Sequence, residues 1–165
     1  MAGIFFMNDK EKLIERFYQS FSKRDYEGMQ ACYHKAVVFE DPAFGILKGE
    51  AAGAMWKMLC LSAKDLSISF RDIHAKGSSV QAVWEAKYTF KKTGRPVHNI
   101  IKAEFTFEDG LIIFHKDSFP LRKWAGQALG WKGYLLGGTA MFKTKLQAQT
   151  KGMLDKFMEA ERGKP

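Results

Sequence analysis

Cysteines and long apolar runs are scarce in this sequence, and both absences narrow the class of protein. Only two cysteines, Cys32 and Cys60, occur among 165 residues, and neither stands near a second cysteine in a zinc-binding or redox spacing. The apolar run at residues 4–7 is shorter than the core of a secretion signal, and no run approaches the roughly 20 apolar residues of a membrane-spanning helix. We therefore expect reduced, buried thiols in a cytoplasmic protein.

Motifs that hold cofactors are also missing. His34, His74 and His98 have no metal-ligand spacing with each other or with acidic residues, and no glycine-rich phosphate loop occurs. No serine lies in a nucleophile-elbow context, and neither cysteine has an evident base beside it. We expect no metal site, no cofactor and no covalent catalysis.

Acidic residues are rare in the last third of the chain. From Pro120 onward there are nine basic residues and three acidic ones, which accounts for six of the eight net positive charges. Lysines there flank an apolar stripe, so contact of the C-terminal helix with a membrane surface or a nucleic acid is one interpretation. The other, which we prefer, is an amphipathic helix packed on its own domain.

The composition that remains, 46% hydrophobic and 14% aromatic, is sufficient for one buried core. Helical spacing of apolar residues predicts helices at residues 9–23, 27–33 and 49–60, with a short strand at 37–39 and a turn at Pro42 and Gly45. Period-two alternation then predicts four strands, at residues 66–74, 80–90, 97–107 and 111–119. Their short links imply an antiparallel meander.

Beyond the meander, the pattern predicts helices at 121–129 and 139–158 around a glycine-rich connector at 130–138. The last helix has an apolar stripe of Phe142, Leu146, Met153 and Phe157. The fold class expected is α+β: N-terminal helices packed on a curved antiparallel sheet, which forms a half-open cone. Residues 1–119 form this domain, and residues 120–165 are a C-terminal helical extension of it.

Alternation along the strands predicts which side chains line the cone. Trp84 and Tyr88 face inward with the small residues between them, and Asn99 is the only polar member of the inward set on the next strand. On the last strand the exposed character of Lys116 places His115 and Asp117 on the inner wall with Ile113. The opposite set, which contains Ile112 and Phe114, is then expected on the outer face.

His115 and Asp117 are therefore a candidate acid–base pair in an apolar cavity, since burial raises the pKa of a carboxyl group and an imidazole can hold or take its proton. The alternative is that the two side chains only satisfy each other, or face solvent. Asp41, where the first strand breaks at Pro42, either turns inward or caps the turn, and capping is the interpretation favoured by its position. Trp56 and the inward aromatics line the cavity or fill the core.

Residues 17–53, with Arg24-Asp25-Tyr26 joining two helices and Phe39-Glu40-Asp41-Pro42 leading into a third, resemble the ketosteroid isomerase and SnoaL-like polyketide cyclase families. The four strands extend the resemblance to about residue 120, and it implies the cone-shaped, cystatin-like fold of the NTF2-like superfamily. It places the isomerase's general base on Asp41. The isomerase's oxyanion-hole tyrosine falls on Phe17, beside Tyr18, and its protonated acid falls on Ala103, so steroid-type isomerisation is not implied.

The cyclases place an aspartate on the late strands, and Asp117 is similar in kind. The resulting hypothesis is a cone that binds a small, mostly apolar ligand and moves a proton on a carbonyl compound without metal or nucleotide. The alternative is a non-catalytic ligand-binding or dimerisation module. Ile100, Ile112 and Phe114 make the outer face apolar enough to suggest a homodimer across the sheet. The expected site is catalytic Asp117, His115 and Asp41, with ligand contacts from Tyr18, Trp56, Trp84, Tyr88 and Asn99.

Overall fold

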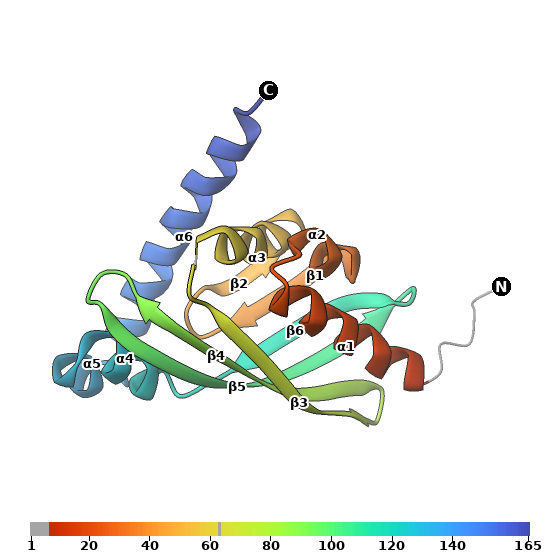
Figure 1. Ribbon diagram of the computed structural model, residues 1–165, viewed down its shortest axis with the longest axis horizontal. Coiled ribbons are helices and arrows are strands. Elements are labelled where there is room, and N and C mark those ends of the chain that lie inside the picture. Colours follow the sequence, from red (N-terminus) through yellow and green to blue (C-terminus); the bar gives the residue numbers. More distant parts are fainter. Residues whose placement is uncertain (1–6, 63) are drawn as a thin grey trace.

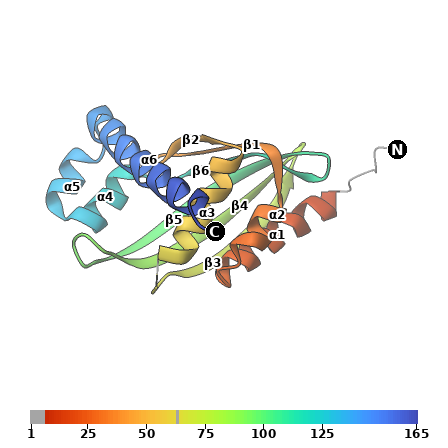
Figure 2. The same ribbon diagram turned by 90° about the horizontal axis from the view of Figure 1, so that it is seen from above.

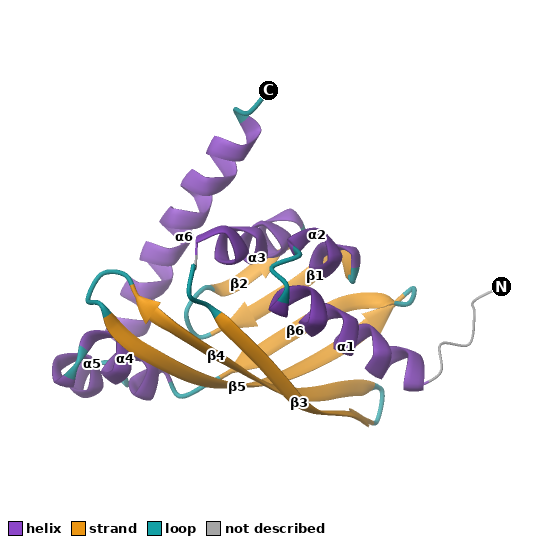
Figure 3. Ribbon diagram, in the orientation of Figure 1, coloured by secondary structure: helices purple, strands orange, loops and turns teal. Residues whose placement is uncertain are grey.

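The computed structural model describes residues 7–62 and 64–165 and shows a curved sheet covered on one face by the first three helices (Figures 1 and 3). The apolar run discussed above lies largely outside these residues. The helices are α1 (Met7–Ser22), α2 (Tyr26–Ala31), α3 (Glu50–Ser62), α4 (Leu121–Leu129), α5 (Trp131–Leu136) and α6 (Ala140–Arg162). The strands are β1 (Tyr33–Asp41), β2 (Gly45–Lys48), β3 (Ser67–Lys76), β4 (Ser79–Phe90), β5 (Arg95–Glu108) and β6 (Leu111–Ser118).

The first helix forms because its apolar residues recur on one face. Ile14, Phe17, Tyr18 and Phe21 are all buried against the sheet. α2 starts after Asp25, whose carboxylate accepts a hydrogen bond from the Gly28 amide and caps the helix. The predicted order of the opening elements is confirmed, although α2 ends at Ala31 and the strand after it is longer than expected.

The sheet has the strand order β2-β1-β6-β5-β4-β3. β3 to β6 form the predicted antiparallel meander, and β1 joins it through parallel pairing with β6. β2 was missed, because it begins directly after the short turn that contains Pro42. The φ of +72° at Gly45 lets the chain reverse there and pair with β1. This fold is the α+β cone expected from the sequence, with a C-terminal helical extension.

The prediction for the faces of β6 was wrong at one position. The pairing of β5 with β6 shifts between Thr106 and Phe107, which leaves Ile113 opposite no partner. This bulge turns Ile112 into the core together with His115 and Asp117, so Ile112 is not part of the outer face. Phe114 is half-buried, and among the apolar residues expected outside only Ile100 is exposed.

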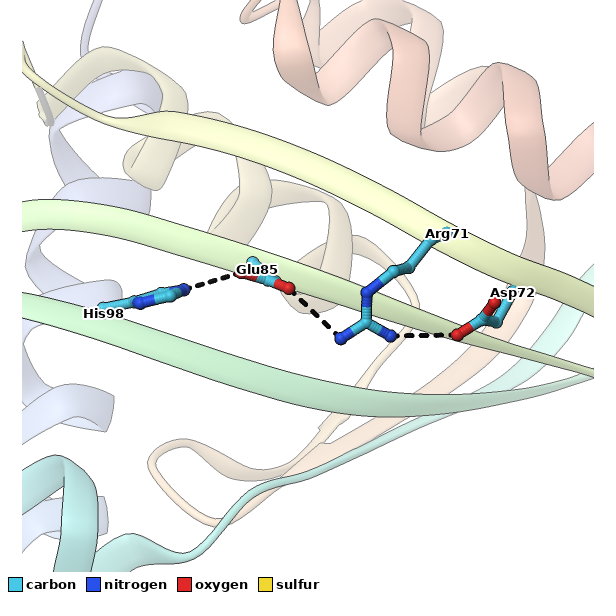
Figure 4. A network of polar contacts seen from close by, with 4 residues as sticks. All are labelled: Arg71, Asp72, Glu85 and His98. Carbon is cyan, nitrogen blue, oxygen red and sulfur yellow. Dashed lines mark hydrogen bonds and ion pairs between the residues drawn. The ribbon is translucent and has the colours of Figure 1, made fainter.

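The outer face is instead crossed by a polar network (Figure 4). Arg71 on β3 donates to Glu85 on β4 over 3.2 Å and to Asp72 over 2.9 Å, and Nε2 of His98 on β5 lies 2.6 Å from Glu85. The hydrogen bond between Glu85 and His98 lowers the pKa of Glu85. The homodimer across this face stays a prediction, with less apolar surface to support it than the sequence suggested.

The C-terminal extension packs on the same sheet. Trp124, Ala125 and Ala128 of α4 form a small second core with Val97 of β5. α6 then runs toward α3 (Figure 2). There Lys57 of α3 pairs with Glu161 of α6 over 2.5 Å. Of its predicted stripe, Met153 is exposed and Leu154 is buried in its place.

The inward position of Leu154 follows from helical spacing, since Leu146, Thr150 and Leu154 lie four residues apart on one face of α6. Thr150 and Gln147 on this side also donate to the backbone carbonyls of Ala43 and Pro42. The predicted connector contains α5. None of the helices in the described part of the chain has the length and apolar character needed to cross a membrane.

Candidate functional site

A chain of four hydrogen bonds runs through the aromatic core. Trp56 Nε1 lies 2.7 Å from Tyr33 Oη, which lies 2.8 Å from His115 Nδ1. His115 Nε2 lies 2.9 Å from Asp117 Oδ1, and Trp84 Nε1 lies 3.3 Å from the same oxygen. These five side chains come from α3, β1, β4 and β6, so the site exists only in the folded chain.

The donors and acceptors available limit the directions of these bonds. An indole N–H can only donate, so Tyr33 Oη accepts from Trp56 and Asp117 Oδ1 accepts from Trp84. The tautomer with its proton on Nε2 satisfies the remaining pairs, since the imidazole then donates to Asp117 and accepts at Nδ1 from the Tyr33 hydroxyl. In this tautomer Oδ1 of Asp117 accepts two N–H groups.

Aromatic rings hold the imidazole in place. His115 is 0% exposed, stacks on Trp56 at an interplanar angle of 10°, and lies between the rings of Phe105 and Phe39 at 4.2 and 5.0 Å. Because side chains two residues apart on a strand share a face, Asp117 follows His115 into the core and is only 3% exposed. The imidazole is thus placed to orient Asp117 rather than to reach a ligand itself.

Two polar groups near the Asp117 end of this hydrogen-bond chain can still form hydrogen bonds. Oδ2 of Asp117 has no hydrogen-bond partner among the described residues. The Tyr18 hydroxyl is fully buried and likewise has no hydrogen-bond partner in the described part of the chain. Burial, and then the charge of Asp117, raises the pKa of Tyr18 well above its usual value, so this hydroxyl keeps its proton as a donor.

Asp41 closes the turn between β1 and β2. Its Oδ1 accepts from the amides of Ala43 and Phe44 at 2.9 and 2.5 Å, so the turn-capping interpretation is confirmed. The pKa of Asp41 is nevertheless raised to about 7, chiefly by burial and then by the negative charge of Asp117, although the two hydrogen bonds lower it. A carboxyl group that exchanges its proton near neutral pH therefore lies within the electrostatic reach of Asp117.

Comparison with known proteins agrees with this architecture. A family model for the SnoaL-like domain matches residues 14–115, which is more than half of the chain. The chain belongs to the SnoaL-like domain family. No curated protein matches it.

Solved structures share the SnoaL-like fold at low sequence identity. A proposed polyketide cyclase from a Silicibacter species has a TM-score of 0.63 and 18% identity, over 74% of this chain and 97% of that one. An LEH-like epoxide hydrolase from M. tuberculosis has a TM-score of 0.61 and 17% identity, over 82% and 96%. A Catenulispora acidiphila protein with a ketosteroid isomerase-like fold has a TM-score of 0.61 and 12% identity, over 71% and 92%. These likenesses show the fold.

Within this SnoaL-like fold, the position that resembles the isomerase's acid is Ala103, and its partner in the strand pairing is Asp117. A carboxyl group missing from β5 is thus present directly opposite on β6. Phe17, at the position of the isomerase's tyrosine, stacks on Tyr33 with 5.4 Å between ring centroids. The rings of Tyr18 and Tyr33, which carry hydroxyl groups, both contact Phe17.

Five of the predicted site residues, His115, Asp117, Tyr18, Trp56 and Trp84, meet in this core, and Asp41 lies at its edge. Tyr88 packs at the boundary between this core and the second one, and Asn99 joins neither. The Tyr88 hydroxyl accepts a hydrogen bond from Trp124 in the second core, and Asn99 is half-buried on the inner face opposite Ala86. Both lie farther along the strands, toward the C-terminal extension.

Tyr33 was missed because the sequence placed it at the end of the second helix. Tyr33 is an even number of residues from Val37 and Phe39, the other buried residues of β1, so period-two alternation could have placed it on the inner face.

Cys32 and Cys60 are buried free thiols, and burial raises the pKa of Cys60 to about 11. Within residues 7–62 and 64–165, no group of three or more potential ligands is arranged to hold a metal ion.

Proposed function

We propose that this protein binds a small, mostly apolar carbonyl compound beside Asp117 and moves a proton on it. Asp117 acts as the base through Oδ2, and Tyr18 donates a hydrogen bond to the carbonyl oxygen. Asp41, with its pKa near 7, is the second proton-exchanging group. His115 is a positioning residue that holds Asp117 through Nε2.

The observation that carries the proposal is the Tyr18 hydroxyl, buried without a partner near a carboxylate that has a free oxygen. A buried donor without an acceptor costs folding free energy, about 1–3 kcal/mol. A ligand carbonyl would supply the missing acceptor. The aromatic surroundings fit a flat or apolar molecule better than a charged one.

Asp117 and Tyr18 are sufficient for the proposed proton transfer. Asp117 takes a proton from the carbon next to the carbonyl, the electron pair moves toward the carbonyl oxygen, and Tyr18 stabilises the resulting enolate by its hydrogen bond. Return of the proton from Asp117 to another carbon completes an isomerisation. The donors His115 and Trp84 stay bound to Oδ1 throughout, which keeps Oδ2 directed at the ligand.

The similar structures support small-molecule chemistry of this general kind. They include a proposed polyketide cyclase and an epoxide hydrolase, whose activities belong to those proteins. The direct test is proton exchange in D2O on a panel of enolisable ketones, followed by proton NMR. Exchange that depends on the enzyme supports the proposal, whereas a panel that shows saturable binding without exchange contradicts the catalytic step.

Binding without turnover is the second candidate function, and the close packing around His115 and Asp117 favours it. His115 is fully enclosed by aromatic rings, and Asp117 is exposed by only 3%. In this case the hydrogen-bond chain has a structural role, and Tyr18 only orients the ligand. Ligand-dependent quenching of tryptophan fluorescence without proton exchange is the expected signature.

We also propose a homodimer through the outer sheet face and a cytoplasmic location. Exposed Ile100 supports the first, and two buried free thiols support the second. Light scattering that shows a strict monomer would count against the dimer. Cell fractionation tests the location.

A further inference from the structure

Helix α5 presents its large apolar side chains outward. Its one buried residue is Gly133, whereas Trp131 is 71% exposed and Tyr134, Leu135 and Leu136 are each more than half exposed. An ordinary surface helix buries its apolar face. This helix does the reverse.

The reversal is fixed by close packing between α5 and α4. A Cβ atom on Gly133 would lie 2.2 Å from the carbonyl oxygen of Ala125, and one on Gly137 would lie 2.6 Å from Ala125 Cβ. Only glycine permits this approach at either position. Gly133 and Gly137 are therefore held against α4. Trp131 and Leu135 stay largely exposed, while the ring of Tyr134 lies against Gly126 and Arg122 of α4 and is still half exposed.

The exposed apolar residues gather at this end of the molecule. Six of the ten large hydrophobic side chains that are exposed in the described chain lie within residues 129–141. We name this surface the apolar tip: Leu129, Trp131, Tyr134, Leu135, Leu136 and Met141. α5 forms one extreme of the long axis, away from the N-terminal end of α1, and no other helix or strand of the described residues lies beyond it (Figures 1 and 2).

An apolar cleft continues the tip inward. Its volume is about 380 Å³, and it lies between α6, α4 and the end of β4. Leu129, Leu136 and Met141 belong to both the tip and the cleft, and Lys92 and Lys145 lie on the cleft wall. The apolar surface is therefore larger than the side chains of α5 alone.

The charge around the tip has one sign. No aspartate or glutamate occurs between Asp117 and Asp155, while the same stretch holds six basic residues. The adjacent hairpin between β4 and β5 adds Lys91, Lys92 and Arg95, and Arg95 is bonded to the backbone of Gln127 on α4. Exposed aromatic and aliphatic side chains inside a basic rim are the features of a membrane-surface contact.

We propose that the apolar tip docks on the surface of a bilayer that contains anionic lipids. Trp131 and Tyr134 would lie at the headgroup level, Leu135 and Leu136 would enter the acyl boundary, and the surrounding lysines would contact the headgroups. A second copy of the chain fits less well, because a two-fold interface at the tip sets the basic rims against each other. The contact is made by α5 rather than by the long C-terminal helix that the sequence suggested.

The test is flotation of the full chain with vesicles of phosphatidylcholine alone and with vesicles that also contain phosphatidylserine. Wild type is expected to float with the anionic vesicles and to be released by salt. The double variant Leu135→Ser/Leu136→Ser should weaken this binding at least about tenfold, because two leucines leave the acyl boundary. Lys132→Glu should weaken it as well, and the thermal unfolding of both variants should match wild type.

A matched control removes exposed apolar side chains elsewhere. Ile46 and Met153 are 61% and 53% exposed and lie outside the tip, so Ile46→Ser/Met153→Ser should float like wild type. Equal loss of binding in this control would overturn the proposal. Three other results would also overturn it. They are no binding of wild type to anionic vesicles, self-association that the leucine variant abolishes, and binding to duplex DNA in place of vesicles.

Discussion

The imidazole Nε2 of His115 lies 2.9 Å from the Asp117 carboxylate in a core where nearly every other neighbour is aromatic. Trp84 donates to the same oxygen, which leaves the second oxygen of Asp117 without a partner among the described residues. Oδ1 of Asp117 is thus held by two hydrogen bonds, whereas Oδ2 has none from these residues. This asymmetry is what the function proposed above depends on.

Asp117→Asn should keep the fold and lose proton exchange. The amide oxygen can still accept from His115 and Trp84, but the group at Oδ2 becomes an NH2 that takes no proton. We expect exchange to fall by at least about a hundredfold, the usual range for a general base. NMR exchange rates and a thermal melt measure both parts, and Glu104→Gln, on the exposed side of the neighbouring strand, is the control.

Tyr33→Phe should destabilise the fold, whereas Tyr18→Phe should not. Removing the Tyr33 hydroxyl leaves the indole of Trp56 and Nδ1 of His115 unpaired in the core, which should cost about 2 kcal/mol of unfolding free energy. Removing the Tyr18 hydroxyl takes away a buried donor that has no partner, so the change should be within about 0.5 kcal/mol or stabilising. Urea denaturation of the two variants measures the contrast.

Tyr18→Phe also distinguishes an effect on ligand binding from an effect on stability. If Tyr18 donates to a ligand, Tyr18→Phe should weaken binding in a protein that is at least as stable as wild type. Loss of stability in Tyr18→Phe would mean that its hydroxyl has a partner in solution.

Asp41→Asn should change the pH dependence of stability. The pKa of Asp41 is raised from 3.8 to about 7, chiefly by burial. The folded chain therefore holds this proton more tightly than the unfolded chain. The resulting stability is fully present below about pH 4 and is lost as pH rises through about 7.

The asparagine variant has no such titration and keeps an oxygen for the turn amides. Relative to wild type, we expect it to gain about 3 kcal/mol of unfolding free energy between about pH 5 and about pH 8. Denaturant unfolding at the two pH values measures the gain. Parallel profiles for the two proteins would show that Asp41 titrates normally.

Gly133→Ala and Gly152→Ala should shift stability in opposite directions. The new Cβ at position 133 meets the Ala125 carbonyl oxygen at 2.2 Å, so α5 must move away from α4, at a cost of about 1–3 kcal/mol. Gly152 lies on α6 with nothing within 4 Å of a new Cβ, so alanine should stabilise by up to about 1 kcal/mol through helix propensity. Thermal unfolding compares them, and a neutral Gly133→Ala would contradict the close packing.

Local patterns in the sequence were sufficient for most of the architecture. Helical spacing in α1 and period-two alternation in β4 and β5 each depend only on neighbours along the chain, so these elements and their inner faces could be predicted. The same alternation places His115 and Asp117 on one face of β6. Their shared face could therefore be predicted from the sequence, but whether the two side chains meet could not.

Tertiary structure decided everything that depends on contacts between distant segments. The bulge at Ile113, which turns Ile112 inward, arises from the pairing of β6 with β5 and leaves no mark on the alternation around it. Tyr33 becomes part of the site only because β1 pairs with β6 and brings its hydroxyl to His115. The outward face of α5 likewise depends on the contact of Gly133 with Ala125, since glycine in a connector indicates freedom of the backbone but not the surface it packs against.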